Sequence, residues 1–333
     1  MNRKIPTTAL TALALILAAT GASAQDIRAR LGHIFAVDSP VDHASQAFAT
    51  CVSEATGGSL DITVFPAGQI GSDEALARDL SRGALEFAFL NTGSLAGLDP
   101  HFDMFGLPYI ATSFDEADAI FYNPDGVLQT TLRETLNEHG MQALSFYELG
   151  FRAVTNSKHR VTSVDDMAGL KLRVPGSAAI QAFVEATGAQ QVTMPFPELF
   201  VALQQGTVDG QDNGASITYN SRLFEAQPYM TLTNHAYAIG AVTASMRTWD
   251  ALSDDQKSAV TTCADEAAEM QIAENRALDG EFLAQIEAGG TEVTQLSDEE
   301  MARFVEAGRG VWLTLEDVYG ADRIAALRAE VGQ

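Results

Sequence analysis

The chain has 333 residues, which is enough for two domains of ordinary size. With 46% hydrophobic and 19% charged residues, it has the composition of a globular protein that buries a substantial core. The formal net charge of −24 argues against nucleic-acid binding, because contacts with phosphates need a basic face. An anionic ligand would therefore have to be held locally, by a few arginines in a cleft.

Residues 1–24 have the pattern of a secretory signal peptide. Arg3 and Lys4 precede an apolar run at 7–20, and Ala22-Ser23-Ala24 fits the small-residue cleavage pattern. The apolar run is too short to span a membrane. We therefore expect the segment to be removed and the mature protein to work in the periplasm.

The chain contains two cysteines, Cys51 and Cys263. In an oxidising compartment the two side chains could form a disulfide. The interpretation favoured by the sequence is instead two small buried side chains on separate helices. Neither cysteine has the spacing of a metal ligand, and the sequence predicts no metal and no cofactor.

Strand and helix patterns alternate between residues 27 and 90. Leu60 to Phe65 alternates as a half-buried strand and is stopped by Pro66. Phe87 to Leu90 is wholly apolar, as in a sheet that is covered on both faces. The predicted elements here are strands at 27–31, 60–65 and 87–90, and helices at 40–52 and 72–80. This alternation favours a mostly parallel sheet with helices on its faces.

The middle of the chain has less regular spacing. Gly169 to Pro175 alternates apolar and polar residues, which predicts a strand that ends at the proline. Residues 148–150 predict a break between strands at 142–147 and 151–155. The remaining predicted elements are helices at 114–121, 126–139, 177–187 and 197–205, a strand and polar loop at 208–214, an ambiguous segment at 217–223, and a strand at 238–246.

A long helix is predicted from residue 254 to residue 287. Ser253 and Gln256 have the spacing of a capping box at its start. An apolar stripe then continues through this segment, interrupted at Gly280. A helix of this length would span ~50 Å, so it could brace two domains.

Arg152 and Arg173 lie at the ends of predicted strands. A guanidinium group presents donors in a fork that matches a carboxylate, so two converging arginines would hold an organic acid. The equally supported alternative is that each arginine pairs with one of the many acidic side chains. No nucleophile–base, metal or phosphate-loop motif is present, and the six histidines are scattered, so no catalytic residue is predicted.

Asn91 and Asn213 lie in loops at the ends of apolar strands. A side-chain amide offers a donor and an acceptor, which suits hydroxyl groups, but ordinary turn chemistry explains each position at least as well. Phe196 lies between two prolines and could cover an apolar face of a ligand. A place in the core explains it equally well.

Two longer motifs resemble a known family, the solute-binding proteins of tripartite ATP-independent periplasmic (TRAP) transporters. They are GLKLRVP at 169–175 and VALQQGTVDGQDN at 201–213. The supporting matches are FPAGQIG at 65–71, GFR at 150–152, TNSK at 155–158, TNH at 233–235 and WDAL at 249–252. The matches spread from residue 32 to about residue 252 in the order of the family.

The resemblance implies an α/β fold of the two-domain periplasmic binding protein (hinged, Venus-flytrap) type. Crossing strands and a long domain-spanning helix would join the two domains. The first domain would comprise residues 25–149 plus 240–278, and the second residues 150–239 plus 279–333. The two domains would close over an organic acid.

The resemblance also implies a ligand site. The carboxylate-binding arginine of the family falls on Arg173, and a second ligand-contacting arginine falls on Arg152. The amide of the family falls on Asn213, and the aromatic residue that covers the ligand falls on Phe196. Sialic-acid binders carry a glutamate where this chain has Asn91, so sialic acid is not expected.

Three further ligand-site residues follow from the resemblance, at positions where members vary or use waters: His33, Val37 and His235. The implied function is capture of a small carboxylate and its delivery to the small and large membrane subunits of a permease driven by an ion gradient, by a monomer. A sugar acid such as a uronate or aldonate is favoured. The alternatives are a C4-dicarboxylate or keto acid, delivery to a signalling receptor and, least supported, a secreted enzyme.

Overall fold

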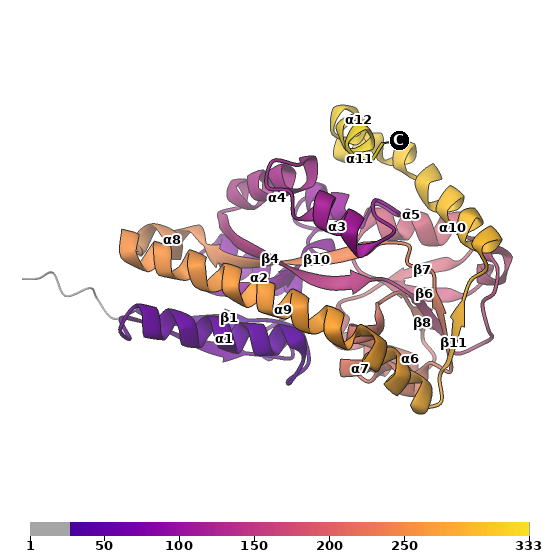
Figure 1. The fold of residues 1–333 in the computed structure, drawn as a ribbon, viewed down its shortest axis with the longest axis horizontal. Coiled ribbons are helices and arrows are strands. Elements are labelled where there is room, and N and C mark those ends of the chain that lie inside the picture. The colour runs from indigo at the N-terminus through magenta and orange to yellow at the C-terminus, as the bar shows by residue number, and fades with distance from the viewer. Residues whose placement is uncertain (1–26, 333) are drawn as a thin grey trace, which may run out of the picture.

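The computed structural model describes residues 27–332, and the predicted signal peptide lies outside the described residues. Two β-sheets form the centres of two α/β halves (Figure 1). The first sheet has the strand order β2-β1-β3-β10-β4, and the second has the order β11-β9-β5-β8-β6-β7. The expected arrangement of two α/β halves joined by crossing strands and a long helix is thereby confirmed.

The first sheet is parallel at one edge and antiparallel at the other. β1 pairs in parallel with both β2 and β3, whereas β10 is antiparallel to β3 and β4. Its strands are β1 (Ile27–Gly32), β2 (Leu60–Phe65), β3 (Phe87–Asn91), β4 (Met141–Phe151) and β10 (Tyr237–Ser245). Four of the five residues of β3 are apolar and all five are buried, which agrees with a strand covered on both faces.

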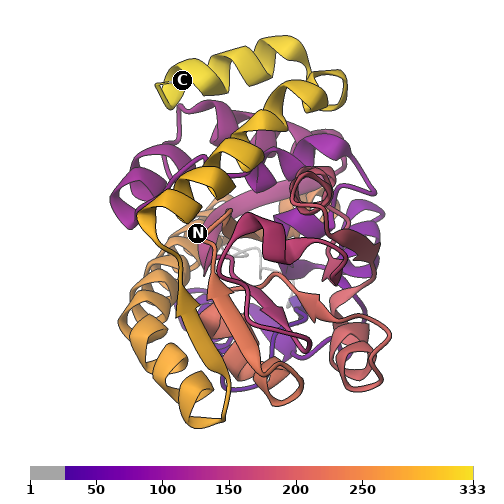
Figure 2. The ribbon, with the colours of Figure 1, turned by 90° about the vertical axis from the view of Figure 1, so that its right-hand side faces the viewer.

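The second sheet contains the short strands of the other half. β6 is parallel to β7 and β8, while β5 is antiparallel to β8 and β9. The strands are β5 (Val154–Asn156), β6 (Lys171–Val174), β7 (Gln190–Thr193), β8 (Gly210–Gln211), β9 (Tyr229–Leu232) and β11 (Glu292–Gln295). Figure 2 looks onto this half of the molecule.

Helices cover both sheets. Within the described residues, none is both long and apolar enough to cross a membrane. The helices of the first half are α1 (Pro40–Ala55), α2 (Asp73–Ser81), α3 (Phe114–Phe121), α4 (Val127–Glu138) and α8 (Met246–Ala251). Those that follow in the second half and at the C-terminus are α5 (Ala178–Ala186), α6 (Leu199–Gln204), α7 (Ala215–Asn220), α10 (Asp298–Gly310), α11 (Glu316–Tyr319) and α12 (Ala321–Glu330).

Two strand connections and a long helix join the halves. β4 of the first sheet leads into β5 of the second, and β9 leads back into β10. The long helix α9 (Asp254–Ala288) contacts α1 and β4 in one half and α7 and β11 in the other (Figure 1). Its predicted capping box is present, since Ser253 and Gln256 exchange side-chain-to-backbone hydrogen bonds. The predicted long helix is therefore confirmed.

The predicted break at 148–150 is wrong. β4 runs on to Phe151 and stays paired with β10, with a register shift where Ala238 faces Gly150 and Ile239 faces Glu148. The extra residue, Leu149, is accommodated as a bulge, and Gly150 takes the positive φ of +83° that the bend needs.

The favoured interpretation of the two cysteines is also wrong. They lie on separate helices, but α1 and α9 pack side by side and Cys51 forms a disulfide with Cys263 (Figure 1). Their Cα atoms are 5.7 Å apart, which is within the reach of a disulfide.

The boundaries of the two domains stay a prediction. One segment packs differently from that expectation: Trp312, Tyr319 and Leu327 belong to the buried cluster around the first sheet, although 279–333 was expected in the second domain. The C-terminal helices therefore cross from the second half back to the first. A matching contact is the hydrogen bond from Trp312 Nε1 to the carbonyl of Pro108, 2.8 Å long.

Candidate functional site

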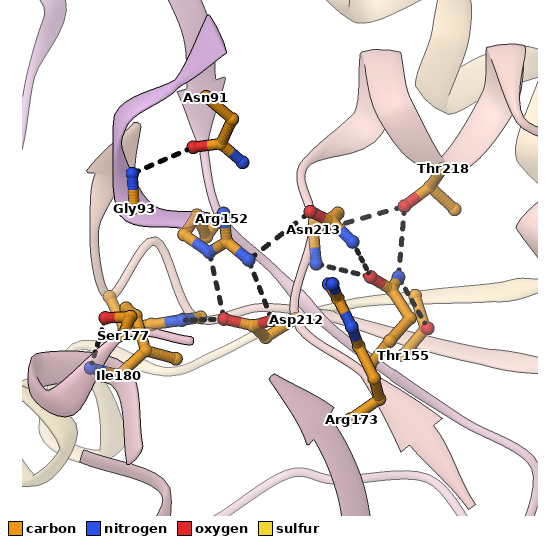
Figure 3. A network of polar contacts seen from close by, with 12 residues as sticks. Asn91, Gly93, Arg152, Thr155, Arg173, Ser177, Ile180, Asp212, Asn213 and Thr218 are labelled. Carbon is orange, nitrogen blue, oxygen red and sulfur yellow. Dashed lines mark hydrogen bonds and ion pairs between the residues drawn. The ribbon is translucent and has the colours of Figure 1, made fainter. Parts of the chain in front are cut away.

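The candidate site lies where polar side chains from the two halves approach one another. Arg173 is at the carboxyl end of β6, and Asn213 follows β8, its neighbour in the sheet. Asn91 ends β3 of the first sheet, and Arg152 follows β4 at the crossing between the halves. All four side chains are buried, and Figure 3 shows them gathered in one polar region.

Arg173 is buried without a partner carboxylate. It is 2% exposed, and its Nε and Nη2 donate to the carbonyl oxygen of Met194 at 3.0 and 2.7 Å. Its guanidinium carbon lies 5.8 Å from the ring centroid of Phe196. Burial, opposed in part by the carboxylate of Asp212, lowers the pKa of Arg173 to about 10. Within the described residues, no carboxylate forms a salt bridge with Arg173 and its Nη1 has no hydrogen bond.

Arg152, in contrast, is neutralised inside the protein. Its Nε and Nη2 donate to Asp212 at 2.9 and 2.8 Å, and Nη2 also reaches Asn213 Oδ1 at 3.3 Å (Figure 3). Burial alone would raise the pKa of Asp212, but Arg152 holds it well below its usual range. The alternative of pairing with an acidic side chain is therefore realised at Arg152. The sequence-predicted contact of Arg152 with a ligand remains a prediction.

His235 supports this ion pair rather than standing alone. Its ring stacks on Phe183 with centroids 4.5 Å apart, and its two nitrogens lie 2.8 Å from Thr233 Oγ1 and 3.5 Å from Asp212 Oδ2. Burial lowers the pKa of His235, although Asp212 opposes the shift. Both ring nitrogens face protein groups, and the sequence-predicted ligand contact of His235 stays a prediction.

Asn213 and Asn91 are held by local contacts. The backbone N–H and the side-chain Nδ2 of Asn213 both donate to Gln211 Oε1, at 2.6 and 2.5 Å. Asn91 Oδ1 accepts a hydrogen bond from Gly93 N at 3.1 Å, which is the turn chemistry considered above. The amide of Asn91 nevertheless lines a cavity of about 20 Å³ together with Arg152, roughly the space of one water molecule.

Two of the predicted ligand-site residues, His33 and Val37, lie in the first loop. His33 is fully buried, contacts Asp42 Oδ1 through Nε2 at 3.3 Å, and stacks on Phe35. Val37 is 56% exposed, so it is not enclosed in the site. Phe35 in turn packs edge-on against Tyr147, so the Phe35 ring lies between His33 and Tyr147.

The sequence reasoning missed two buried residues, Asp73 and Tyr147. Asp73 is the first residue of α2, and its Oδ1 accepts from Asn91 N at 3.2 Å. Tyr147 lies in β4 and is fully buried. An aspartate in the first turn of a helix is ordinarily explained by the helix dipole, and a tyrosine in a strand by its core packing. Neither pattern signals a site.

The two halves touch across the site, so the structure shows a closed form. Pro197 of the second half lies beside Gly68 of the first, where an added Cβ would be 3.4 Å from Pro197 Cγ. Asp103 Oδ2 of the first half accepts from Ala179 N, at the start of α5, at 2.9 Å. These contacts join the two halves around the buried polar groups.

Comparison with known proteins places this geometry in context. The model of the bacterial extracellular solute-binding proteins, family 7, matches residues 31–317. The C4-dicarboxylate-binding periplasmic protein DctP of Rhodobacter capsulatus is 31% identical over 97% of this chain and 96% of its own length. The 2,3-diketo-L-gulonate-binding periplasmic protein YiaO of Escherichia coli is 28% identical over 68% of this chain and 69% of its own length.

Solved structures are similar over nearly the whole chain. The sugar acid binding protein DctPAm of Advenella mimigardefordensis, in complex with galactonate, has a TM-score of 0.88 and 32% identity, and the match covers 92% of this chain and 98% of that one. A TRAP periplasmic solute-binding protein of Sulfurospirillum deleyianum with bound succinate has a TM-score of 0.85 and 28% identity, with coverage of 92% and 99%.

Proposed function

Because this chain belongs to family 7 of the bacterial extracellular solute-binding proteins, we propose that it captures a small organic acid in the periplasm and delivers it to a TRAP membrane permease. The resemblance of the sequence motifs to TRAP solute-binding proteins is confirmed by the same match. The family is one of binding proteins, and the residues of the site offer a binding chemistry rather than a catalytic one.

One observation carries the proposal: Arg173 is a buried cation without a partner carboxylate in the described residues. A buried charge that is not paired is costly, and a ligand carboxylate would compensate it. The carbonyl of Met194 and the ring of Phe196 fix the guanidinium plane, so the remaining donor edge has a set direction. Arg152 supplies no comparable charge, since Asp212 already neutralises it.

A sugar acid is the favoured ligand. Structures similar to this one hold galactonate, β-D-galacturonate and L-gulonate, and others hold succinate. The amides of Asn91 and Asn213 are neutral groups that suit hydroxyls. A C4-dicarboxylate, as in the relative from Rhodobacter capsulatus, is the second candidate.

Binding would drive closure of the two halves. A ligand that contacts Arg173 in the second half and the Asn91 region in the first makes both sets of contacts only in the closed form of the protein. Such a ligand shifts the population toward the closed form. The closed shape is what the small and large membrane subunits of the permease would recognise in a monomer of this protein. A signalling receptor that reads the same shape is an alternative partner.

A thermal-shift screen followed by calorimetry tests the proposal. The panel contains aldonates, uronates, C4-dicarboxylates, keto acids and neutral sugars, because a ligand that binds only the folded protein raises its melting temperature. We expect at least one sugar acid to raise the melting temperature and to bind in calorimetry. A panel in which no carboxylate stabilises the protein, while a neutral solute does, would contradict the proposal.

A further inference from the structure

Six buried side-chain atoms have no hydrogen-bond partner among the described residues, and two of these are oxygen atoms of residues that neighbour Asn91 on the first sheet. They are Asp73 Oδ2 and Tyr147 Oη. The side chains are 1% and 0% exposed. Buried polar atoms are almost always paired in native proteins, because leaving one unpaired costs free energy. Two such atoms in one place therefore require an explanation.

The register of the first sheet brings the two groups together. Gly240 of β10 pairs with Asn91 of β3 on one side and with Tyr147 of β4 on the other. Residues paired in an antiparallel sheet place their side chains on the same face. A Cβ at Gly240 would lie 2.0 Å from Tyr147 Cζ, so the missing side chain is what lets the phenol lie across β10. On the far side of β10, Asn91 N–H holds the carboxylate of Asp73.

The electrostatics agree with this placement. Burial and, after it, the nearby carboxylate of Asp73 raise the pKa of Tyr147 well above its usual value, so its hydroxyl keeps its proton. Arg173 in turn acts on Asp73 across the cleft. The charge of Glu74 opposes the ionised form of Asp73, and the Ser94 hydroxyl favours it as a hydrogen-bonding neighbour of the carboxyl group, while Oδ2 itself keeps no partner. The pair thus lies on the first-sheet side of the site, opposite the arginine.

We propose that Asp73 and Tyr147 form a hydroxyl-recognition subsite, so that the acid held by Arg173 is a hydroxylated monocarboxylate rather than a dicarboxylate. A hydroxyl group donates one hydrogen bond and accepts others, which matches Asp73 Oδ2 and the Tyr147 Oη–H together. A second carboxylate only accepts, so Asp73 could bind it only while protonated and would repel it once ionised. This inference rests on the proposed function, because it assumes that Arg173 binds the ligand's carboxylate.

Calorimetry at pH 9, where Asp73 is mostly ionised, with galactonate, galacturonate and succinate tests the subsite. We expect the wild-type protein to bind at least one of the two sugar acids more tightly than succinate. Asp73→Asn and Tyr147→Phe should each lower the affinity for that sugar acid by about 10-fold or more. A loss of this size is typical of a hydrogen bond in a buried site. Both substitutions should change succinate affinity less, because succinate offers no hydroxyl to the pair.

The pH profile provides a second readout. Burial raises the pKa of Asp73 to about 8. The ionised form of Asp73 accepts a stronger, charge-assisted hydrogen bond from a ligand hydroxyl, so sugar-acid affinity should rise and not fall between pH 6 and pH 9. Succinate would need the protonated form, so any succinate binding should weaken as the pH rises through that range. This dependence should be absent in Asp73→Asn.

Matched controls keep the test specific. Tyr109→Phe also removes a buried tyrosine hydroxyl, which donates to Thr233 O at 3.0 Å, and Asp79→Asn changes an aspartate of the same helix α2. Both should bind the sugar acid as the wild type does. Melting curves of all four variants identify any that fail to fold, and Tyr147→Phe removes a single oxygen.

Three outcomes would overturn the inference. If Asp73→Asn and Tyr147→Phe keep full sugar-acid affinity while Arg173→Ala loses it, the subsite is wrong and the proposed function stands. If succinate binds the wild type more tightly than either sugar acid, the assigned ligand class is wrong. If no acid binds at all, the subsite and the proposed function fail together.

Discussion

At the scale of single residues, the contrast between two arginines decides the chemistry of the site. Arg152 has a bidentate carboxylate partner inside the protein, and Arg173 has none among the described residues. Two guanidinium groups of equal formal charge therefore differ in what they can still bind. Arg152 fixes the position of Asn213, and Arg173 remains free to neutralise an external anion.

Arg173→Ala should weaken ligand binding by about 2–5 kcal/mol, or tens- to thousands-fold, because the ligand's carboxylate would be buried without its partner. Arg173→Lys should restore only part of the loss, since an ammonium group lacks the planar fork. Calorimetry with the best acid of the screen measures both. An alanine variant that binds as tightly as the wild type would remove Arg173 from the site.

The sequence predicted Arg173 because its surroundings are local. Strand alternation, a terminal proline and a family motif all lie within seven residues. Asp73 and Tyr147 could not be found in this way, because their meeting depends on Gly240, which is remote in sequence from both. Pairing between β3, β10 and β4 creates that neighbourhood, and single-residue patterns do not encode it.

At the scale of elements, the long helix α9 is fixed to the rest of the molecule at two points. Near its start, Cys263 is bonded to Cys51 of α1. Further along, Asn275 and Arg276 bind the buried carboxylate of Glu148 in β4, at 2.8 and 2.6 Å. The capping box and the apolar stripe were enough to predict the helix itself. Its attachments depend on long-range packing and were not predicted.

Replacing both Cys51 and Cys263 by alanine should lower the free energy of unfolding by about 2–4 kcal/mol, because the crosslink restricts the unfolded chain. The helices α1 and α9 still pack, so the variant should fold. Urea unfolding measures the change. As a control, a reductant should destabilise the wild type and leave the variant unaffected, and equal stability of the two oxidised proteins would contradict the prediction.

Glu148→Gln should destabilise the crossing between the halves. The carboxylate accepts hydrogen bonds from Tyr237 Oη, Asn275 and Arg276, and losing its charge should cost about 2 kcal/mol. The matched control is Asp118→Asn, which changes the more exposed partner of Arg276 and should cost less than about 1 kcal/mol. Chemical unfolding compares the two. Equal losses of unfolding free energy in the two variants would contradict the prediction that Glu148 contributes more to stability than Asp118.

At the scale of the whole molecule, buried carboxylates link the stability of the fold to pH in opposite directions. Burial opposes the ionised form of Asp212, but Arg152 holds its pKa below the usual range. The contribution of Asp212 to stability is therefore present at neutral pH and is lost as the pH falls. Asp73 and Asp103 have raised pKa values because they are buried, so their contribution is lost as the pH rises. Asp103 lies at a contact between the halves, where its carboxyl group accepts a hydrogen bond from Ala179 N.

Asp103→Asn should flatten part of the pH dependence of stability. Burial raises the pKa of Asp103 to about 6, while hydrogen bonds from Ser177, Tyr319 and Ala179 oppose the shift. The folded state therefore holds the proton more tightly than the unfolded chain, whose aspartates titrate near pH 4. In the wild type, the stabilising contribution of Asp103 is complete below about pH 4 and is lost as the pH rises through about 6.

An asparagine keeps an acceptor for Ala179 N–H and for the Tyr319 hydroxyl, but it does not titrate. Relative to the wild type, Asp103→Asn should therefore gain stability between pH 4 and pH 7, by up to about 3 kcal/mol for a shift of two pKa units. The many surface carboxylates titrate alike in both proteins, so the difference between their urea-unfolding free energies isolates Asp103. If that difference is constant from pH 4 to pH 7, the contact between the halves carries no buried titrating carboxyl.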